Sequence, residues 1–156
     1  MKHDIFIDTN IASRFTNPMD PGYIALIQWL LTFNPESGRN AFLVVSKKLL
    51  AEYHRSSVYA HTHTCIAVII NTLLMQGRLT IITNNQIKSF QQSFFTKKVL
   101  KVLHSNHEDR NHIPVVLLSD RKYALSIDEA FCHDLIHFPG FVVRVEKRPE
   151  NLPYNQ

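Results

Sequence analysis

The sequence predicts an α/β fold, a three-layer sandwich around a central, mainly parallel, five-stranded sheet. Short runs of β-branched and aromatic residues alternate with segments of helical spacing, which implies right-handed crossovers between parallel strands. Most of these runs are apolar on consecutive residues, a pattern typical of strands covered on both faces. The 156 residues, 45% hydrophobic, suffice for one domain with a core and are too few for two.

The predicted elements follow from these runs and from the turn residues between them. Gly77 and the Pro139-Gly140 pair mark two of the turns. Two consecutive helices after the second strand predict a helical hairpin that projects from one end of the sheet. We expect one domain over 1–148 and a flexible C-terminal tail over 149–156. The predicted strands cover 5–7, 42–45, 79–82, 115–118 and 141–145, and the predicted helices 23–33, 47–59, 62–75, 87–104 and 123–136.

Composition limits the compartment and the partners. The longest apolar stretch, 65–75, is interrupted by Asn71 and Thr72, so we expect neither a membrane span nor a signal peptide. Cys65 and Cys132 are far apart and support neither a disulfide framework nor a four-ligand zinc site, which favours a cytoplasmic protein. The net charge of +4 favours an anionic partner, although such an excess is common among proteins of other functions.

Acidic residues follow several predicted strands. Asp8 ends the first strand, Asp120 ends the fourth, and Glu52 lies in the helix after the second, while Asp109 precedes the fourth strand. The carboxyl ends of parallel strands gather functional groups, so we expect these carboxylates to meet at one edge. Clustered like charges repel unless a cation neutralises them. Oxygen ligands without a nearby Cys or His pair favour Mg²⁺ or Mn²⁺ over zinc.

The motifs around these acids resemble those of the PIN domain family, over about residues 5–145. Members of that family are mostly metal-dependent ribonucleases and include toxins of bacterial toxin–antitoxin pairs. The resemblance is carried by Ile5-Phe6-Ile7-Asp8-Thr9-Asn10, by Val44-Val45-Ser46 with Glu52 six residues on, by Asp109, and by Leu117-Leu118-Ser119-Asp120.

This resemblance implies roles for individual residues. It makes Asp8, Glu52, Asp109 and Asp120 the catalytic, metal-holding acids, with hydrogen-bonding support from Thr9, Asn10 and Ser119. It also implies RNA as substrate, an antitoxin protein as partner, and a homodimer. The apolar segment 23–33 with Trp29 suits pairing of two chains, and burial in the core explains it equally well.

The second half of the chain departs from the family pattern. Family members usually carry a full helix between the third acid and the strand that ends in the fourth, often in a Thr-x-Asp context. Here only 110–113 separate Asp109 from Pro114, and the last motif reads Leu-Ser-Asp. Either that helix is reduced to a single turn, or the third acid is another residue. The other candidates are Glu108, Asp128 and Asp134.

The sequence therefore predicts a divalent-metal-dependent ribonuclease that hydrolyses RNA phosphodiester bonds. The alternative is a catalytically degraded PIN-like module for RNA binding or scaffolding, and the shortened region around Asp109 is its main support. Each acid also has a structural interpretation, because Asp8 and Asp120 are good helix caps and Glu52 is an ordinary surface residue.

Basic and histidine residues complete the candidate set. A basic stripe on the helix before Asp109, extended by residues near Glu52, either contacts phosphates or is simply a solvated face. Zinc at His133 with His137, or at His61 with His63, is not predicted, because the first pair has no third ligand at useful spacing. The candidate nucleic-acid-binding residues are Lys47, Lys48, Arg55, Lys97, Lys98 and Lys101.

Overall fold

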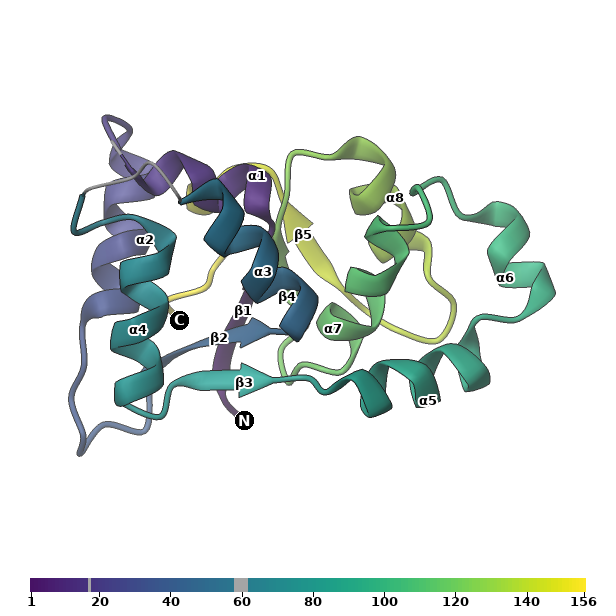
Figure 1. Cartoon of the computed structure of the whole chain (residues 1–156), viewed down its shortest axis with the longest axis horizontal. Helices are drawn as coiled ribbons and strands as arrows, with labels where there is room; N and C mark the ends of the chain where they lie inside the picture. The colour runs from purple at the N-terminus through teal and green to yellow at the C-terminus, as the bar shows by residue number, and fades with distance from the viewer. Residues whose placement is uncertain (17, 58–61) are drawn as a thin grey trace.

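A parallel sheet forms the centre of the computed structural model, which describes residues 1–16, 18–57 and 62–156 (Figure 1). In these ranges the sheet has five strands in the order β3-β2-β1-β4-β5, and every neighbouring pair is parallel. The α/β class and the strand number are as predicted. The strands are β1 (His3–Ile7), β2 (Ala41–Val45), β3 (Leu79–Ile81), β4 (Tyr123–Leu125) and β5 (Arg144–Glu146).

Helices cover the sheet in two packed groups. In the first group α3 contacts α1 and α4, and α4 contacts α2, while in the second group α7 contacts α5 and α8. Right-handed crossovers place these groups on opposite faces, which gives the predicted three layers. Every helix in the described ranges is too short or too polar to cross a membrane. The α-helices are α1 (Thr9–Ala12), α2 (Pro21–Leu31), α3 (Lys47–Ser56), α4 (Ile66–Met75), α5 (Asn84–Phe94), α6 (Lys97–Val102), α7 (Ile113–Leu117) and α8 (Glu129–His137), and the 3-10 turns are η1 (Ser13–Thr16), η2 (Asp109–His112) and η3 (Pro149–Asn151).

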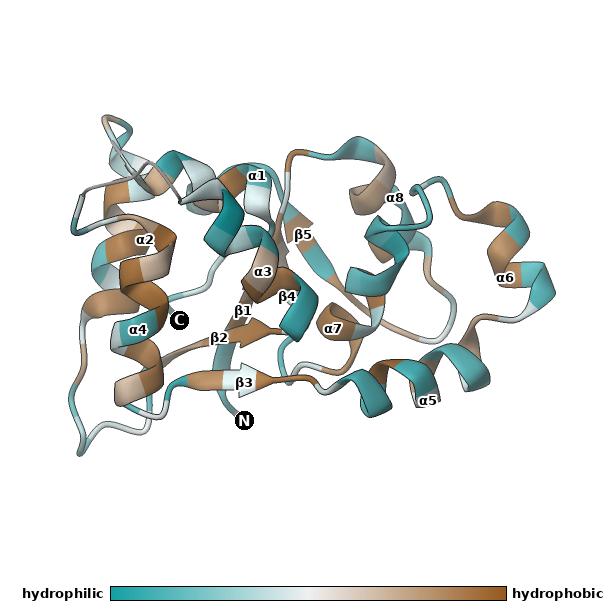
Figure 2. Ribbon diagram, in the orientation of Figure 1, coloured by the Kyte–Doolittle hydropathy of each residue, from teal (hydrophilic) through white to brown (hydrophobic). Residues whose placement is uncertain are grey.

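The core is centred on β1 and its neighbours. Ile5, Phe6 and Ile7 are completely buried, as consecutive residues of a doubly covered strand must be. Figure 2 shows β1 to β3 largely hydrophobic, together with α2 and α4 on one side. Because both faces are covered, the ends of the strands are where polar groups reach the surface.

The predicted fourth strand is wrong. Residues 113–117 form α7, and the strand lies later, at β4, where the sequence predicted the start of a helix. All five residues of α7 are buried, and a helix buried on every side has the same unbroken apolar pattern as a buried strand. Pro114 in the first helical turn fits α7, because no helical hydrogen bond needs its missing N–H there.

Smaller differences concern the lengths of helices. The helix predicted over 87–104 is divided into α5 and α6, because the Thr96 side chain accepts a hydrogen bond from the Val99 amide at 3.2 Å and starts a new helix. The predicted hairpin, α3 with α4, is present, but Ile69 and Leu73 are fully buried, so it packs on the domain rather than projecting. The predicted end of its first helix, over 58–59, lies outside the described residues.

The C-terminal segment is packed against the domain, which corrects the expected flexible tail. Leu152 and Tyr154 are buried, and the Tyr154 ring lies 4.8 Å from that of Trp29, centroid to centroid. The Tyr154 carbonyl accepts a hydrogen bond from Arg121 at 2.8 Å. Trp29, which the sequence offered for pairing of two chains, is thereby engaged within the same chain.

A buried arginine joins three elements. Gly77, with φ of +68°, ends α4 in the left-handed conformation that glycine favours, and the next residue is Arg78, 1% exposed. Its guanidinium donates to the carbonyls of Leu30 at 2.7 Å and Ala41 at 3.2 Å. Arg78 thus links the end of α2 to the start of β2.

We predict that Arg78→Leu lowers the free energy of unfolding by about 2–4 kcal/mol, because it leaves two buried carbonyls without donors. Urea denaturation measures the loss. Arg39→Leu in the exposed 32–40 loop is the control and should change the value by less than about 0.5 kcal/mol. Equal stability of the two variants would contradict the role assigned to Arg78.

Candidate metal centre

The carboxyl ends of β1 and β4 are joined by hydrogen bonds around Asp8. The Asp8 amide donates to the Leu125 carbonyl at 2.9 Å, and the Ser126 hydroxyl donates to Asp8 Oδ2 at 2.6 Å. The Thr9 amide donates to Oδ1 at 2.8 Å, so Asp8 also caps α1. Parallel pairing of the two strands therefore fixes the position of this carboxylate.

Asn10 connects the same two strand ends. Its amide nitrogen lies 3.3 Å from Asp8 Oδ2 and 3.4 Å from the Ser126 hydroxyl, and its Oδ1 accepts from the Ile127 amide at 3.3 Å. The hydroxyl of Thr9 is buried and has no partner within the described residues. Two of the predicted supporting residues thus lie at the site, and Ser126 adds a support that the sequence prediction missed.

Asp128 occupies this edge of the sheet as well. Its amide donates to the Ser126 hydroxyl at 3.1 Å, and its carboxylate caps α8 by accepting from the Phe131 amide at 3.0 Å. The sequence offered Asp128 only as an alternative third acid. The available signal was Ser126-Ile127-Asp128, a Ser-x-Asp that is close to the Thr-x-Asp context of the family, but it fell inside a segment predicted as helix.

Asp120 lies elsewhere, which corrects its predicted place. Its amide donates to Asp4 Oδ2 at 2.8 Å, and its carboxylate accepts from the Lys2 amide at 2.8 Å. Both contacts lie at the start of β1, the opposite end of the strand from Asp8. Ser119, the predicted support of Asp120, is buried and donates to the Val116 carbonyl. The structure does not bring Asp120 to the other acids.

Asp109 is the first residue of η2, and α7 follows directly. The helix that seemed to be missing after the third acid is therefore present. Burial raises the pKa of the half-buried Asp109 carboxyl, and the nearby charges of Asp128 and Glu52 raise it further. This effect indicates that the three carboxylates face a common region.

Glu52, on α3, is paired with a histidine. Its Oε2 lies 2.7 Å from His112 Nε2. Burial alone would raise the pKa of Glu52, but the hydrogen bond and charge of His112 lower it overall. One turn earlier, Lys48 Nζ lies 2.5 Å from the carboxylate and 2.8 Å from the carbonyl of Glu108. Two contacts thus join α3 to η2.

The remaining candidate acids have structural partners. Glu108 is paired with Lys48, and its side chain is 78% exposed. Asp134 is buried and accepts hydrogen bonds from the backbone amides of His104 at 2.8 Å and Ser105 at 2.7 Å. Neither residue replaces Asp109 in the group.

The donor set at this edge suits a hard divalent cation, since all four acids offer carboxylate oxygens. Burial raises the pKa of Asp8, and the charge of Asp109 adds to the rise against the hydrogen bond from Ser126. A cation would relieve this repulsion. Within the described residues, no three His, Cys, Asp or Glu side chains already stand close enough together to hold a metal. The four acids are Asp8, Glu52, Asp109 and Asp128.

The basic candidates do not form one surface. Lys97, Lys98 and Lys101 are exposed on α6, which Figure 1 shows at the far end of the molecule from α3. The α3 group consists of exposed Lys47 and Arg55 with Lys48, which is paired with Glu108. The sequence prediction of a single basic surface is therefore corrected to two separate groups.

The histidines of α8 stack rather than converge. The rings of His133 and His137 lie 4.3 Å apart, and the ring of His104 lies parallel to His133 at 3.7 Å. Among the described residues these rings do not form a metal-holding group. His61, of the second pair considered, lies outside the described residues.

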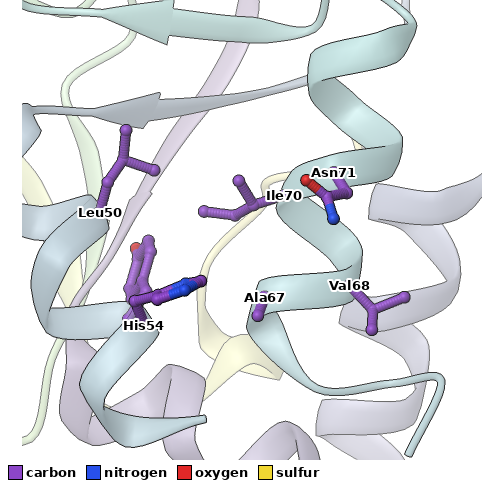
Figure 3. Close-up of a pocket in the computed structure, with 7 residues that line it drawn as sticks. Leu50, His54, Ala67, Val68, Ile70 and Asn71 are labelled. Carbon is purple, nitrogen blue, oxygen red and sulfur yellow. The ribbon is translucent and has the colours of Figure 1, made fainter. Parts of the chain in front are cut away.

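A pocket of about 290 Å³ opens between α3 and α4 (Figure 3). Leu50 and His54 reach into it from α3, opposite Ala67 and Ile70 of α4. None of the four acids lines it, so this mainly apolar pocket is separate from the candidate metal centre.

Fold and site together define an α/β protein with acids at the carboxyl edge of a five-stranded parallel sheet. No protein-family model matches the chain, and no curated protein is similar to it in sequence. Its fold is similar to that of a chain in the crystal structure of VapBC2 from Rickettsia felis bound to a DNA fragment from their promoter. The TM-score is 0.55 at 15% identity, over 92% of this chain and 98% of that chain. The likeness agrees with the predicted α/β fold around a central parallel sheet.

We predict that Asp109→Asn makes the protein more stable at neutral pH. The pKa of Asp109 is higher in the folded chain than its ordinary value of 3.8, so ionisation opposes folding and stability falls as pH rises through that interval. Urea denaturation should show the variant more stable than wild type at about pH 7 and nearly equal to it at about pH 3. The control is Glu36→Gln in an exposed loop, and a gain at pH 3 as large as that at pH 7 would contradict the electrostatic cause.

Proposed function

We propose that this protein is a divalent-metal-dependent endoribonuclease, with Asp8, Glu52, Asp109 and Asp128 holding Mg²⁺ or Mn²⁺. The observation that carries the proposal is that one hydroxyl, of Ser126, donates to the Asp8 carboxylate and accepts from the Asp128 amide. Asp109 is near enough for its charge to raise the pKa of Asp8. Further support comes from the charges of Asp128 and Glu52, which also raise the pKa of Asp109, close to the strand ends where open α/β folds bind their ligands.

The chain's own groups divide the work of phosphodiester hydrolysis. The four acids would hold the ion, whose chemistry when bound would be to lower the pKa of a water and to stabilise charge on the phosphate. Asp8 is held in place by the Thr9 amide and the Ser126 hydroxyl, which suits a residue that would fix the position of the metal ion. The Asp109 carboxylate makes no hydrogen bond within the described part of the chain, which leaves its oxygens free to orient a water or accept its proton.

The charge distribution favours a nucleic acid as substrate, and the family resemblance implies that this nucleic acid is RNA. The three exposed lysines of α6 supply phosphate contacts that position a strand without reading its sequence. The α3 group lies beside Glu52 and would contact the same strand closer to the acids.

The proposed biological role is that of a toxin paired with an antitoxin protein. Its support is the likeness in fold to a chain of the VapBC2 complex, of which 98% is covered. A cytoplasmic location fits the two free, buried cysteines, which a reducing compartment would leave unpaired.

The alternative, an RNA-binding or scaffold module without activity, loses its main sequence argument because α7 follows Asp109 after all. Titration with Mn²⁺ separates the two functions, since an intact acid group binds the ion and a degraded one does not.

We predict that Asp8→Asn lowers Mn²⁺-dependent RNA cleavage by more than about 100-fold, because even partners outside the metal's direct ligands contribute roughly 10- to 100-fold. The fold should persist, since an asparagine still accepts the bond from the Thr9 amide. Cleavage of a labelled RNA under Mn²⁺ gives the rate, and circular dichroism checks the fold.

The matched control is Asp120→Asn at the opposite end of β1, which should cleave like wild type. Wild-type activity in Asp8→Asn, or loss of activity in both variants, would overturn the assignment of the acids.

We further predict that replacing Lys97, Lys98 and Lys101 together by Gln weakens RNA binding and lowers its salt dependence. Each lost phosphate contact on a single strand reduces the slope of log K against log salt by roughly 0.7, so the slope should fall by about 2. Filter binding over a salt series measures it. Arg39→Gln, in the exposed 32–40 loop, is the control. An unchanged slope in the triple variant would show that the lysines of α6 face solvent and do not contact RNA.

A further inference from the structure

His112 is a buried titratable residue that the acid group does not by itself explain. It ends η2, is 2% exposed, and packs against the rings of Phe6 and Phe131, with centroids 5.9 Å and 6.5 Å away. Its Nε2 reaches Glu52 at 2.7 Å, while its Nδ1 is buried without a partner among the described residues. Packing therefore fixes the orientation of the ring, and the hydrogen bond to Glu52 is the one polar contact that the ring makes among the described residues.

The direction of that contact follows from the hydrogen-bonding capacity of the ring. A carboxylate only accepts, so His112 Nε2 donates to Glu52 Oε2. The contact thus aligns a defined donor with one oxygen of Glu52.

Glu52 needs such a partner more than the other acids do. Asp8 and Asp128 are short side chains held by backbone amides as helix caps, whereas glutamate has an additional torsion angle and Glu52 lies within a helix. With Oε2 held by His112, Oε1 is the oxygen left for other ligands.

The neighbouring contact, Lys48 with Glu108, joins the same two elements but differs in burial. Its side chains are 29% and 78% exposed, against 3% for His112 and 21% for Glu52. Exposed ion pairs constrain geometry weakly. The Glu108 carboxylate therefore serves as a matched control for the buried contact.

We propose that His112 is a positioning residue that orients the Glu52 carboxylate for metal binding. The inference rests on the proposed function of the acid group and adds to it an imidazole N–H donor, supplied by η2. His112 touches neither the metal nor RNA in this role and acts only through Glu52.

The test compares variants that differ in where they place a donor. His112→Gln keeps an N–H near the position of Nε2, His112→Asn places one only near Nδ1, and His112→Leu removes it. We expect Mn²⁺ affinity, measured by calorimetry, and kcat for RNA cleavage to fall roughly 10- to 100-fold in the Asn and Leu variants. Gln should restore most of both values, while KM for RNA stays unchanged in all three.

Controls keep the outcome decisive. Glu108→Gln, which removes the charge of the exposed ion pair, should leave Mn²⁺ affinity at the wild-type value. Asn and Gln are both polar and similar in size, so an Asn–Gln difference remains informative if the Leu variant does not fold. Equal losses in His112→Asn and His112→Gln would overturn the positioning role. Wild-type affinity and kcat in His112→Leu or His112→Asn would overturn it as well. In either case the Asp8→Asn variant still tests the acid group separately. A wild-type protein that neither binds Mn²⁺ nor cleaves RNA would remove the proposed function and this inference together.

Discussion

The hydrogen bond from Ser126 to Asp8 is the contact on which the candidate site depends. It joins the ends of β1 and β4, and it forms only when these strands pair in parallel with the Asp8 amide on the Leu125 carbonyl. The same hydroxyl accepts from the Asp128 amide, so one serine aligns two of the four acids. The sheet order, with β4 beside β1 although about 115 residues lie between them, is thus a requirement of the site as much as of the fold.

Asp4 and Asp8, at opposite ends of β1, show how the fold separates structural carboxylates from those of the candidate site. Asp4 is fully buried at the start of β1, and its two oxygens accept from the backbone amides of Asp120 and Arg121 at 2.8 and 3.0 Å. Asp8, at the other end, is also hydrogen-bonded, yet burial and the charge of Asp109 still raise its pKa. Repulsion from Asp109 thus remains at Asp8 in spite of its hydrogen bonds, as expected of a functional site, and such sites typically reduce stability.

Sequence reasoning succeeded where local pattern and tertiary environment agree. The apolar run before Asp8 predicted β1, and the helix after β2 predicted the place of Glu52. It failed at 115–118, because an unbroken apolar run does not distinguish a buried strand from a buried helix, and this error moved the expected fourth acid to Asp120. The true strand, β4, has only three residues, too few for a period to be read. Its Ser-x-Asp ending and Pro114 were the available signals, whereas the Glu52–His112 contact is tertiary and had none.

The contacts that build the candidate centre connect distant parts of the chain, because Asp8 and Ser126 are 118 positions apart and Glu52 and His112 are 60 positions apart. Closing loops of this length before any compensating contact forms is entropically unfavourable, so such contacts belong to the late stages of folding. During synthesis from the amino terminus, the first 125 residues contain Asp8, Glu52 and Asp109 but neither Ser126 nor Asp128. A nascent or truncated chain therefore carries three of the four acids without the contacts that align them, and the proposed metal centre can form only after residue 128 has been added.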